Sequence, residues 1–248
     1  MCGRFGLTRP ERLDLQRFGI EQLPTLSPRF NIPPGDNVLV VRLREGAREA
    51  GFLKWGLVPW WASDPSIGAR LANARSDTAF EKPSFRDAVR ARRCLIPADL
   101  FYEWQAIPGQ RKKQPYAVRL RSEEPFALGG IWDFWRPKEG GEGIASCAIL
   151  TTEPNTLLAP IHDRMPVIVP PGRYRAWLDP RTPAPAVMDL MQQSFPSDEM
   201  EAWPIGLRVN STKDDDAELL EREEAPSISF PQPARATPHP GGAARPRR

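Results

Sequence analysis

Short apolar stretches separated by turn residues run through most of this chain, and they predict a protein built largely of β-strands. Residues 37–44 (NVLVVRLR) and 50–57 (AGFLKWGL) read as two strands joined around a Glu-Gly turn. The same kind of pattern predicts further strands at 93–104, 115–121, 125–135, 146–152, 165–169 and 203–209. Many short strands, rather than long helices, are therefore the main structural signal.

Helical signals are fewer and shorter. Residues 84–92 start with a serine that can cap a helix, and Phe85, Ala88 and Val89 then fall on one helical face, which predicts a helix. Other helices are expected at 10–18, 172–178 and 185–194. The sequence has no internal repeat, no βαβ regularity and no glycine-rich phosphate loop, so a nucleotide-binding fold is disfavoured. The prediction is a single α+β domain with a curved, mostly antiparallel sheet.

The end of the chain differs in composition from the rest. Residues 225–248 (APSISFPQPARATPHPGGAARPRR) contain six prolines and almost no large apolar side chains. Such a segment buries too little surface to offset its ordering entropy, so we predict a domain at 1–224 and a disordered tail beyond it. The acidic run at 214–224 is expected to form a solvated helix or an exposed end of that domain.

Composition excludes several classes of protein. The 29 prolines are about 12% of the 248 residues, which argues against a long helical bundle. No run of about 18 apolar residues could span a membrane, and the opening MCGRFGLTRPER lacks an apolar signal core. Three cysteines fit a reducing compartment, so we expect a cytoplasmic protein. Two histidines and no C-x-x-C motif leave little for a zinc site, and we expect neither metal nor cofactor.

Charge is unevenly distributed along the chain. Residues 1–113 hold 19 Lys and Arg against 12 Asp and Glu, a balance of +7, whereas residues 114–224 hold 11 against 19, a balance of −8. Of the 34 basic residues 28 are arginines, which form planar bidentate contacts with phosphate. The basic half therefore permits a polyanionic partner, although charge scattered over an ordinary surface would give the same numbers.

Cys2 is the first candidate for chemistry. Methionine is removed when the second residue is small, and the mature chain would then begin with a cysteine that carries a thiol and a free α-amine on adjacent carbons. The reference pKa of that amine is about 7.7–8.0, so part of it is unprotonated near neutral pH. An amine condenses with an aldehyde to an imine, and the neighbouring thiol can close on the imine to give a thiazolidine. The alternative is that Cys2 is simply a small second residue.

His162 and Glu103 are candidates for proton transfer. His162 in IHDRMPVIV is the only histidine outside the tail, and imidazole is the side chain best suited to proton transfer near neutral pH; a purely structural role is the alternative. Glu103 interrupts the apolar stretch LFYEW, where it either faces water by strand alternation or points into a pocket. Burial among aromatic residues would raise its pKa and make it a usable general acid.

Three further groups could hold a substrate. Asn73 in LANARSD can bind an amine or a carbonyl through its amide, and Arg75 would share a face with it in a strand. Arg4 lies two residues after Cys2, so two cations could flank the nucleophile if these segments adjoin. Trp60 and Trp61 follow a proline in a predicted loop, where they could stack on bases; the alternative is that both indoles fill the core.

Taken together, these segments resemble the SOS response-associated peptidase (SRAP) family, which processes abasic sites in DNA. The resemblance spans most of residues 1–210 and rests on the order and combination of its motifs. These are MCGRF, RFNIPPGD, WGLVPWWASD, NARSDT, then F-x-x-x-x-x-x-R-R-C-L-I-P-A-x-x-F-Y-E-W, TT-x-x-N, HDRMPVI and VNS. It implies a pseudo-barrel α+β fold with a positive groove for single-stranded DNA that contains abasic sites.

The resemblance also implies roles for the candidate residues. Cys2, after Met1 removal, would attack the ring-opened abasic aldehyde and end as a stable thiazolidine crosslink, a lyase-type activity. The residues expected to surround that terminus are Asn73, Glu103 and His162. Phosphates would be bound by Arg4, Arg75 and Arg164, and Trp60 or Trp61 would stack beside the lesion. Asp77 stands where the family more often has glutamate, which leaves the role of that acid open.

Three other functions remain compatible with the residues. A cysteine peptidase that cleaves its own N-terminus or a partner would need only the thiolate of Cys2, whereas a crosslinker needs the α-amine as well. An N-terminal-nucleophile amidotransferase would also begin Met-Cys-Gly, but it leaves the tryptophan pair and HDRMP unexplained. A plain single-strand binding module would bind without a covalent product. We expect a monomer in all four cases.

Overall fold

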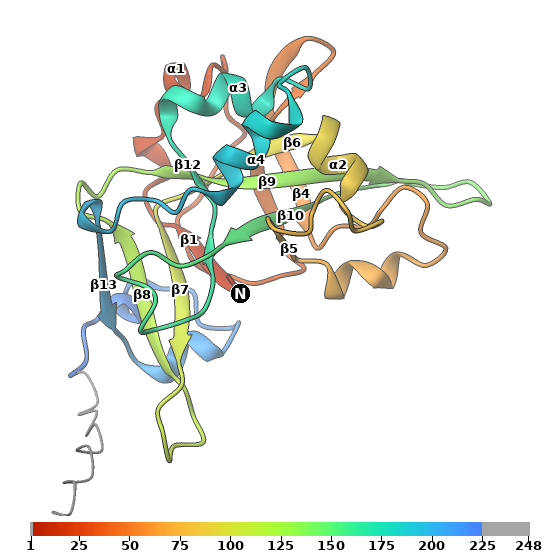
Figure 1. The fold of residues 1–248 in the computed structure, drawn as a ribbon. Helices are drawn as coiled ribbons and strands as arrows, with labels where there is room; N and C mark the ends of the chain where they lie inside the picture. Colours follow the sequence, from red (N-terminus) through yellow and green to blue (C-terminus); the bar gives the residue numbers. More distant parts are fainter. Residues whose placement is uncertain (1, 225–248) are drawn as a thin grey trace, which may run out of the picture.

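Two sheets form the framework of residues 2–224, which are the part of the chain described in this computed structural model (Figure 1). The predicted α+β class with mostly antiparallel strand pairing is confirmed, and one of the sheets closes on itself. The predicted tail at 225–248 lies outside the described residues.

The first sheet is open and entirely antiparallel. Its strands, in the order β13-β8-β7-β1-β2, are β13 (Met200–Pro204), β8 (Gln114–Leu120), β7 (Leu100–Gln105), β1 (Arg4–Leu7) and β2 (Arg29–Ile32). Arg4 lies opposite Tyr102, and Phe5 lies opposite Phe101. This register brings the residues that precede β1 alongside the end of β7.

The second sheet contains a closed ring of five strands. These are β3 (Asn37–Arg44), β4 (Ala47–Trp55), β10 (Ile144–Thr152), β9 (Phe126–Trp135) and β6 (Arg93–Ala98), where β3 pairs with both β4 and β6. β10 pairs with both β4 and β9, and β6 pairs with β9, which completes the ring. Three short strands extend it: β5 (Asn73–Arg75) and β11 (Met165–Pro166) on β10, and β12 (Ile168–Val169) on β9.

Side chains of the ring strands alternate between two hydrophobic cores, as the two-residue period of a strand requires. Val38 and Val40 of β3 belong to the core that also contains Phe101 of the first sheet. Leu39 and Val41 belong to the core that contains residues of the helices. The closed sheet is therefore covered on one side by the first sheet and on the other by helices.

The helices are short. They are α1 (Leu15–Phe18), α2 (Arg86–Ala91), α3 (Tyr174–Leu178) and α4 (Ala184–Gln192), and 3-10 turns occur at η1 (Pro10–Arg12), η2 (Pro65–Arg70), η3 (Pro171–Arg173), η4 (Ser197–Glu199), η5 (Leu207–Asn210) and η6 (Ala217–Leu220). Arg93, which is 2% exposed, fastens the ends of α2 and α3 together. Its guanidinium donates to the carbonyl oxygens of Val89, Arg90, Trp177 and Asp179.

Most predicted strands are confirmed, including the Glu-Gly hairpin. Glu45 and Gly46 both have positive φ, 52° and 85°, as the two-residue turn between β3 and β4 requires. The single strand predicted at 93–104 is wrong, because Asp99 separates β6 from β7. Its carboxylate accepts hydrogen bonds from the backbone N–H groups of Thr8 and Arg9, and the chain passes from one sheet to the other at this point.

The helices predicted at 84–92 and 185–194 are confirmed as α2 and α4, with ends that differ by up to two residues, whereas two other helices and two strands differ more. The helix predicted at 10–18 is broken, because Asp14 is extended and caps α1, while Gly19 ends α1 in the left-handed conformation. The helix predicted at 172–178 begins as the turn η3. The strand predicted at 165–169 is divided between two partners, β10 and β9. The strand predicted at 203–209 ends at Pro204, which has no N–H for a ladder, and continues as η5.

The acidic run after η5 is attached to β2 at its start, while residues 217–218 and 221–224 are exposed, as predicted. Asn31 is buried, and its Nδ2 donates to the carbonyl oxygens of Val209, Ser211 and Asp214. The Asp215 carboxylate accepts from the backbone N–H groups of Phe30 and Asn31. Since β2 is the neighbour of β1, this segment holds the strand that follows Cys2.

Candidate active site

Four of the predicted site residues come together where the two sheets meet. Cys2 precedes β1, Glu103 lies on β7, Asn73 begins β5, and His162 lies in the loop between β10 and β11. Figure 1 shows the start of β1 between β7 and β5. Residues that are far apart in the sequence are thus brought to one place by the pairing of β1 with β7 and of β5 with β10.

Cys2 is fully buried. Its Sγ lies 3.7 Å from the carbonyl oxygen of Arg4, to which the thiol donates. Burial, and secondarily the nearby Glu103 carboxylate, raise the pKa of the thiol. At neutral pH the thiol is therefore protonated, and a thiolate is not the resting form.

Asn73 holds the backbone of Cys2. Its Nδ2 donates to the carbonyl oxygen of Cys2 at 2.9 Å. Its Oδ1 is buried and has no hydrogen-bond donor among residues 2–224, so this oxygen can accept from a substrate or from a new chain terminus. Asn73 is fixed in turn, because the preceding carbonyl oxygen of Ala72 accepts from Trp55 Nε1 and from the backbone N–H of Ile149.

Glu103 points into the protein rather than to solvent. It is 1% exposed, so the solvent-facing alternative is wrong and the side chain lies inside the protein. Burial raises the pKa of Glu103 to about 7. A carboxyl group with such a pKa exchanges its proton readily at neutral pH, as a general acid or base must.

His162 lies beside Glu103, with its Nε2 at 3.9 Å from Glu103 Oε2. Its Nδ1 accepts a hydrogen bond from the backbone N–H of Arg164 at 3.0 Å, which leaves the proton of the neutral ring on Nε2. Asp163 Oδ1 also lies 2.9 Å from Nδ1, but that side chain is 84% exposed, and the backbone donor decides the tautomer. Burial lowers the pKa of His162 and favours the neutral ring.

Two residues that the sequence did not single out hold the His162 loop in place. Gln105 follows Glu103 on the same face of β7, and its Nε2 donates to the carbonyl oxygen of Pro160 at 2.9 Å. Asn155 Oδ1 accepts from the backbone N–H of Leu158, and the carbonyl oxygen of Leu158 accepts from the backbone N–H of His162. Asn155 closes the TT-x-x-N motif, so that motif was the available signal; nothing in the sequence marks Gln105.

The three predicted DNA-binding arginines are placed differently from one another. Arg75 is exposed and forms an ion pair with Asp77, with Nη2 and Oδ2 at 2.6 Å. Arg4 is half-buried, and its Nη1 donates to the carbonyl oxygen of Gly3.

The side chain of Arg164 is only 6% exposed, contrary to the expectation that it contacts phosphate. Its guanidinium donates to the carbonyl oxygen of Thr151, and its Nη1 lies 3.8 Å from Asp77 Oδ2. Arg164 therefore anchors the His162 loop to β10 from within the protein.

Trp60 and Trp61 are exposed, by 59% and 42%, so the alternative that both indoles fill the core is wrong. They lie in the loop after β4, which is fastened to the closed sheet. Asp133 Oδ2 accepts from the backbone N–H of Trp60, and Trp135 Nε1 donates to the carbonyl oxygen of Ala62. A rigid loop that presents two indoles to solvent is suited to stacking on flat ligands.

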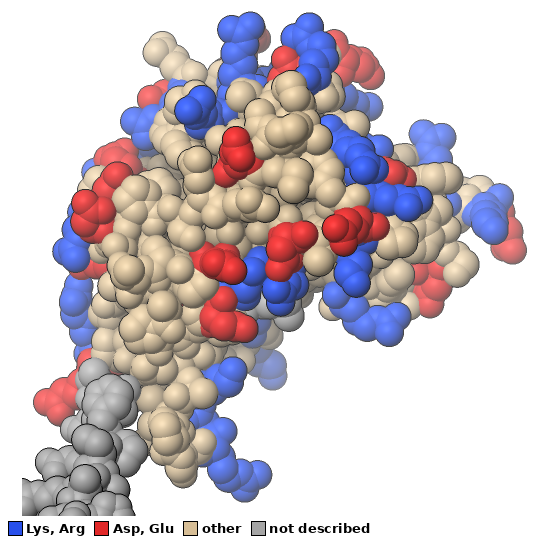
Figure 2. All heavy atoms as spheres, in the orientation of Figure 1, with Lys and Arg blue, Asp and Glu red and all other residues tan. Residues whose placement is uncertain are grey.

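Basic side chains lie on both sides of a hollow in this face of the molecule. Figure 2 shows Lys and Arg at the β7–β8 hairpin and beside η2, with acidic side chains between them near the centre. The hairpin loop carries Arg111, Lys112 and Lys113 in succession. Acidic side chains lie at the centre of the hollow and basic side chains lie on both sides of it. This arrangement favours a ligand that runs along the hollow and carries negative charge at both ends.

Among residues 2–224 no group of three His, Cys, Asp or Glu side chains is arranged to hold a metal ion. Within the same residues no helix is long and apolar enough to cross a membrane. Cys94 and Cys147 are free thiols, and both are fully buried.

The chain matches the model of one protein family, described as SOS response associated peptidase (SRAP), over residues 1–212. It is 39% identical to the abasic site processing protein YoqW of Bacillus subtilis over 224 residues, which cover 89% of this chain and 99% of that protein. It is 29% identical to the abasic site processing protein HMCES of Pongo abelii, over 89% of this chain and 75% of the relative.

Solved structures share the fold. A protein from Bacteroides thetaiotaomicron superposes with a TM-score of 0.79 at 25% identity, over 90% of this chain and all of that one. A protein from Bordetella bronchiseptica superposes with a TM-score of 0.70 at 27% identity, over 83% of this chain and all of that one.

Proposed function

Because the chain belongs to the SOS response associated peptidase family, we propose that it processes abasic sites in single-stranded DNA by forming a covalent crosslink through Cys2. The relatives named abasic site processing protein support the substrate class. The observation that carries the chemistry is the placement of the second residue of the chain among Asn73, Glu103 and His162. Removal of Met1 would create a 1,2-aminothiol within that group.

The proposed reaction begins at nitrogen. The α-amine of Cys2 attacks C1′ of the ring-opened sugar, and the carbinolamine loses one water to give an iminium ion. The thiol sulfur then bonds to the same carbon, and the thiol proton passes to the Glu103 carboxylate, which has given its own proton to the departing hydroxyl group. The amine attacks first because the raised pKa of the thiol leaves little thiolate at neutral pH. The product is a thiazolidine with a net loss of one water.

Glu103 and His162 divide the proton transfers in this scheme. With a pKa of about 7, Glu103 can take a proton from the attacking amine and return it to the departing hydroxyl group. The neutral His162 ring, with its proton on Nε2, donates a hydrogen bond to a sugar oxygen. Asn73 Oδ1 accepts from the amine and directs its lone pair towards the lesion. These roles need no metal or cofactor.

The same observations count against a cysteine peptidase. A peptidase that acts in trans needs a thiolate, whereas burial and the Glu103 carboxylate both raise the pKa of the Cys2 thiol. The His162 ring is not free to take the thiol proton, because its Nδ1 already accepts the Arg164 N–H and its Nε2 carries the proton. The arrangement therefore suits a thiol that closes a ring on a neighbouring iminium better than a thiol that attacks a peptide.

The DNA strand is proposed to follow the hollow, with Arg75 and Arg4 at phosphates and Trp60 or Trp61 stacked beside the lesion. A monomer suffices, since all four reacting residues come from one chain. An abasic DNA substrate would place the protein in the cytoplasm, at the nucleoid if the cell is bacterial.

The direct test of this function uses the mature protein and a single-stranded oligonucleotide with one abasic site. We expect a protein–DNA adduct that survives denaturing electrophoresis. An oligonucleotide that carries a tetrahydrofuran analogue, which lacks the aldehyde, should bind without forming the adduct. Equal adduct formation with both oligonucleotides would contradict the proposal.

Arg75 and Asp77 are expected to change DNA affinity in opposite directions. Arg75→Ala removes a phosphate contact, so affinity for single strands should fall and the salt dependence should flatten by roughly one unit. Asp77→Asn removes the carboxylate that pairs with Arg75, so affinity should rise. Fluorescence anisotropy across a salt series checks both, with Arg86→Ala on α2 as the control. An unchanged slope for Arg75→Ala would remove Arg75 from the interface.

Gln105→Leu is expected to slow crosslinking without weakening DNA binding. The change removes the hydrogen bond to Pro160, so the His162 loop loses its anchor on β7. Misplacement of a reacting group by about 1 Å can cost up to about a hundredfold in rate. Single-turnover rates at saturating DNA measure this effect. Gln114→Leu is the control, because the Gln114 amide lies on the same hairpin but donates to the carbonyl oxygen of Ile205. A loss of affinity with an unchanged rate constant would contradict the positioning role.

A further inference from the structure

A cavity lies away from the Cys2 site, between the β3–β4 hairpin and α3. Its volume is about 570 Å³, and its lining comprises Leu43, Gly46, Arg48, Arg175, Leu178 and residues 179–181. In Figure 1 the hairpin and α3 lie at the top of the molecule, away from the start of β1 near its middle. A ligand held here leaves the Cys2 site open.

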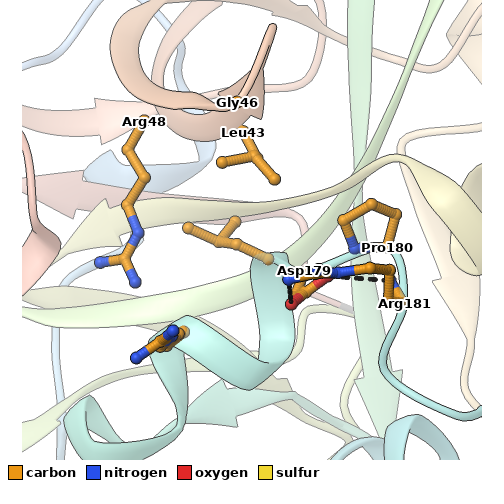
Figure 3. Close-up of a pocket in the computed structure, with 8 residues that line it drawn as sticks. Leu43, Gly46, Arg48, Asp179, Pro180 and Arg181 are labelled. Atoms are coloured by element: carbon orange, nitrogen blue, oxygen red, sulfur yellow. Dashed lines mark hydrogen bonds and ion pairs between the residues drawn. The ribbon is translucent and has the colours of Figure 1, made fainter.

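The floor of this cavity is apolar. Leu178 is 3% exposed at the end of α3, and Leu43 is partly buried on β3. Pro180 adds an apolar edge. In Figure 3 Leu43 and Arg48 extend from the hairpin into the hollow above α3. A cavity of this size accepts more than one side chain of a bound segment.

Two guanidinium groups in the lining lie beyond ion-pair distance of the lining carboxylate, although Arg175 still acts on Asp179 electrostatically. Arg48 donates to the carbonyl oxygen of Phe18, and neither Arg48 nor Arg175 forms an ion pair with another residue in 2–224. The one carboxylate of the lining is already engaged, because Asp179 binds the Arg181 guanidinium through both oxygens. The lining thus holds three arginines (Arg48, Arg175 and Arg181) against one carboxylate, a balance of +2, above an apolar floor.

We propose that this cavity binds an acidic peptide segment of a partner protein, one that carries a leucine-sized side chain between carboxylates. The apolar side chain fills the space over Leu43 and Leu178, and the carboxylates pair with Arg48 and Arg175. Charge complementarity selects an acidic partner over a basic one, and the apolar floor selects a peptide over a bare polyanion. The proposal does not depend on the reaction at Cys2.

The test uses fluorescence anisotropy with the full-length protein and a fluorescein-labelled peptide of aspartates that contains two leucines. We expect saturable binding that Arg175→Glu weakens by at least about tenfold, because like charges then face each other. Arg173→Glu, which makes the same charge change outside the cavity, should leave the affinity within about twofold of wild type. Replacing the leucines of the peptide with serines should also weaken binding.

Arg175 is the primary position because its side chain forms no hydrogen bond to another residue in 2–224, whereas Arg48 donates to the carbonyl oxygen of Phe18. Arg48→Gln tests the second cation without reversing its charge, and it too should weaken binding. The proposal is overturned by the absence of saturable binding, by equal losses in Arg173→Glu and Arg175→Glu, or by a serine peptide that binds as well as the leucine peptide. If a single-stranded oligonucleotide displaced the peptide, and Arg175→Glu weakened the binding of that oligonucleotide, the cavity would be assigned to nucleic acid instead.

Discussion

Replacing Cys2 with alanine is expected to abolish the stable DNA adduct while leaving non-covalent binding to single strands intact. Alanine is small enough for Met1 to be removed, so the variant keeps a free α-amine and loses only the thiol. An imine can then form, but it cannot close to a thiazolidine, and it hydrolyses on denaturation. Denaturing electrophoresis after incubation with abasic DNA should therefore show no adduct.

Borohydride distinguishes the carbon–nitrogen bond of the proposed product from its carbon–sulfur bond. Reduction traps an imine, so Cys2→Ala should yield an adduct only when the reductant is present during incubation. Cys147→Ala is the matched control, since it removes another fully buried thiol that lies outside the site and should leave adduct formation intact. A stable adduct of Cys2→Ala without reductant would show that sulfur takes no part in the linkage.

Glu103→Gln is expected to slow crosslinking by about 10²–10⁴-fold, the usual contribution of a general acid or base. The wild-type rate should change with pH around the Glu103 pKa of about 7, and that dependence should disappear in the variant. Single-turnover rates across a pH series measure both effects. Glu201→Gln, a carboxylate on β13 that pairs with Arg119 away from the site, is the control.

The same substitution is expected to stabilise the fold at alkaline pH. The pKa of Glu103 is about 7 when folded, above its ordinary value of 4.5, so the unfolded chain loses this proton at lower pH than the folded chain. Stability therefore falls as pH rises between these values, by about 3 kcal/mol at most. Glu103→Gln should unfold at higher denaturant concentration than wild type at pH 8 and show no such gain at pH 4. Rates and unfolding midpoints that match wild type at every pH would remove Glu103 from the mechanism.

Local patterns were sufficient to predict the strands that pair with sequence neighbours. The alternation in NVLVVRLR and the Glu-Gly turn identified the β3–β4 hairpin, because both signals act within a few residues. The corner at Asp99 could not be read in this way. It depends on hydrogen bonds to Thr8 and Arg9, some 90 residues away, and the flanking residues are buried on both sides.

The candidate site was predictable residue by residue but not as an arrangement. Cys2, Asn73, Glu103 and His162 carry the right chemistry as isolated residues, and family motifs connect them. Their proximity depends on the register of β1 against β7 and of β5 against β10, which no local pattern specifies. Arg164 shows where prediction from motifs stops. The HDRMPVI motif led us to expect a phosphate contact from Arg164, but its side chain lies inside the protein.

The central claim is that the amine and the thiol of Cys2 both bond to the lesion, and the intact mass of the adduct tests it most directly. Mature protein incubated with an abasic single-stranded oligonucleotide should give a species whose mass is the sum of the two components less one water. A variant with an additional residue ahead of Cys2, which blocks the α-amine, should give none. An adduct at wild-type yield from the blocked variant, or a mass without the loss of water, would contradict the account.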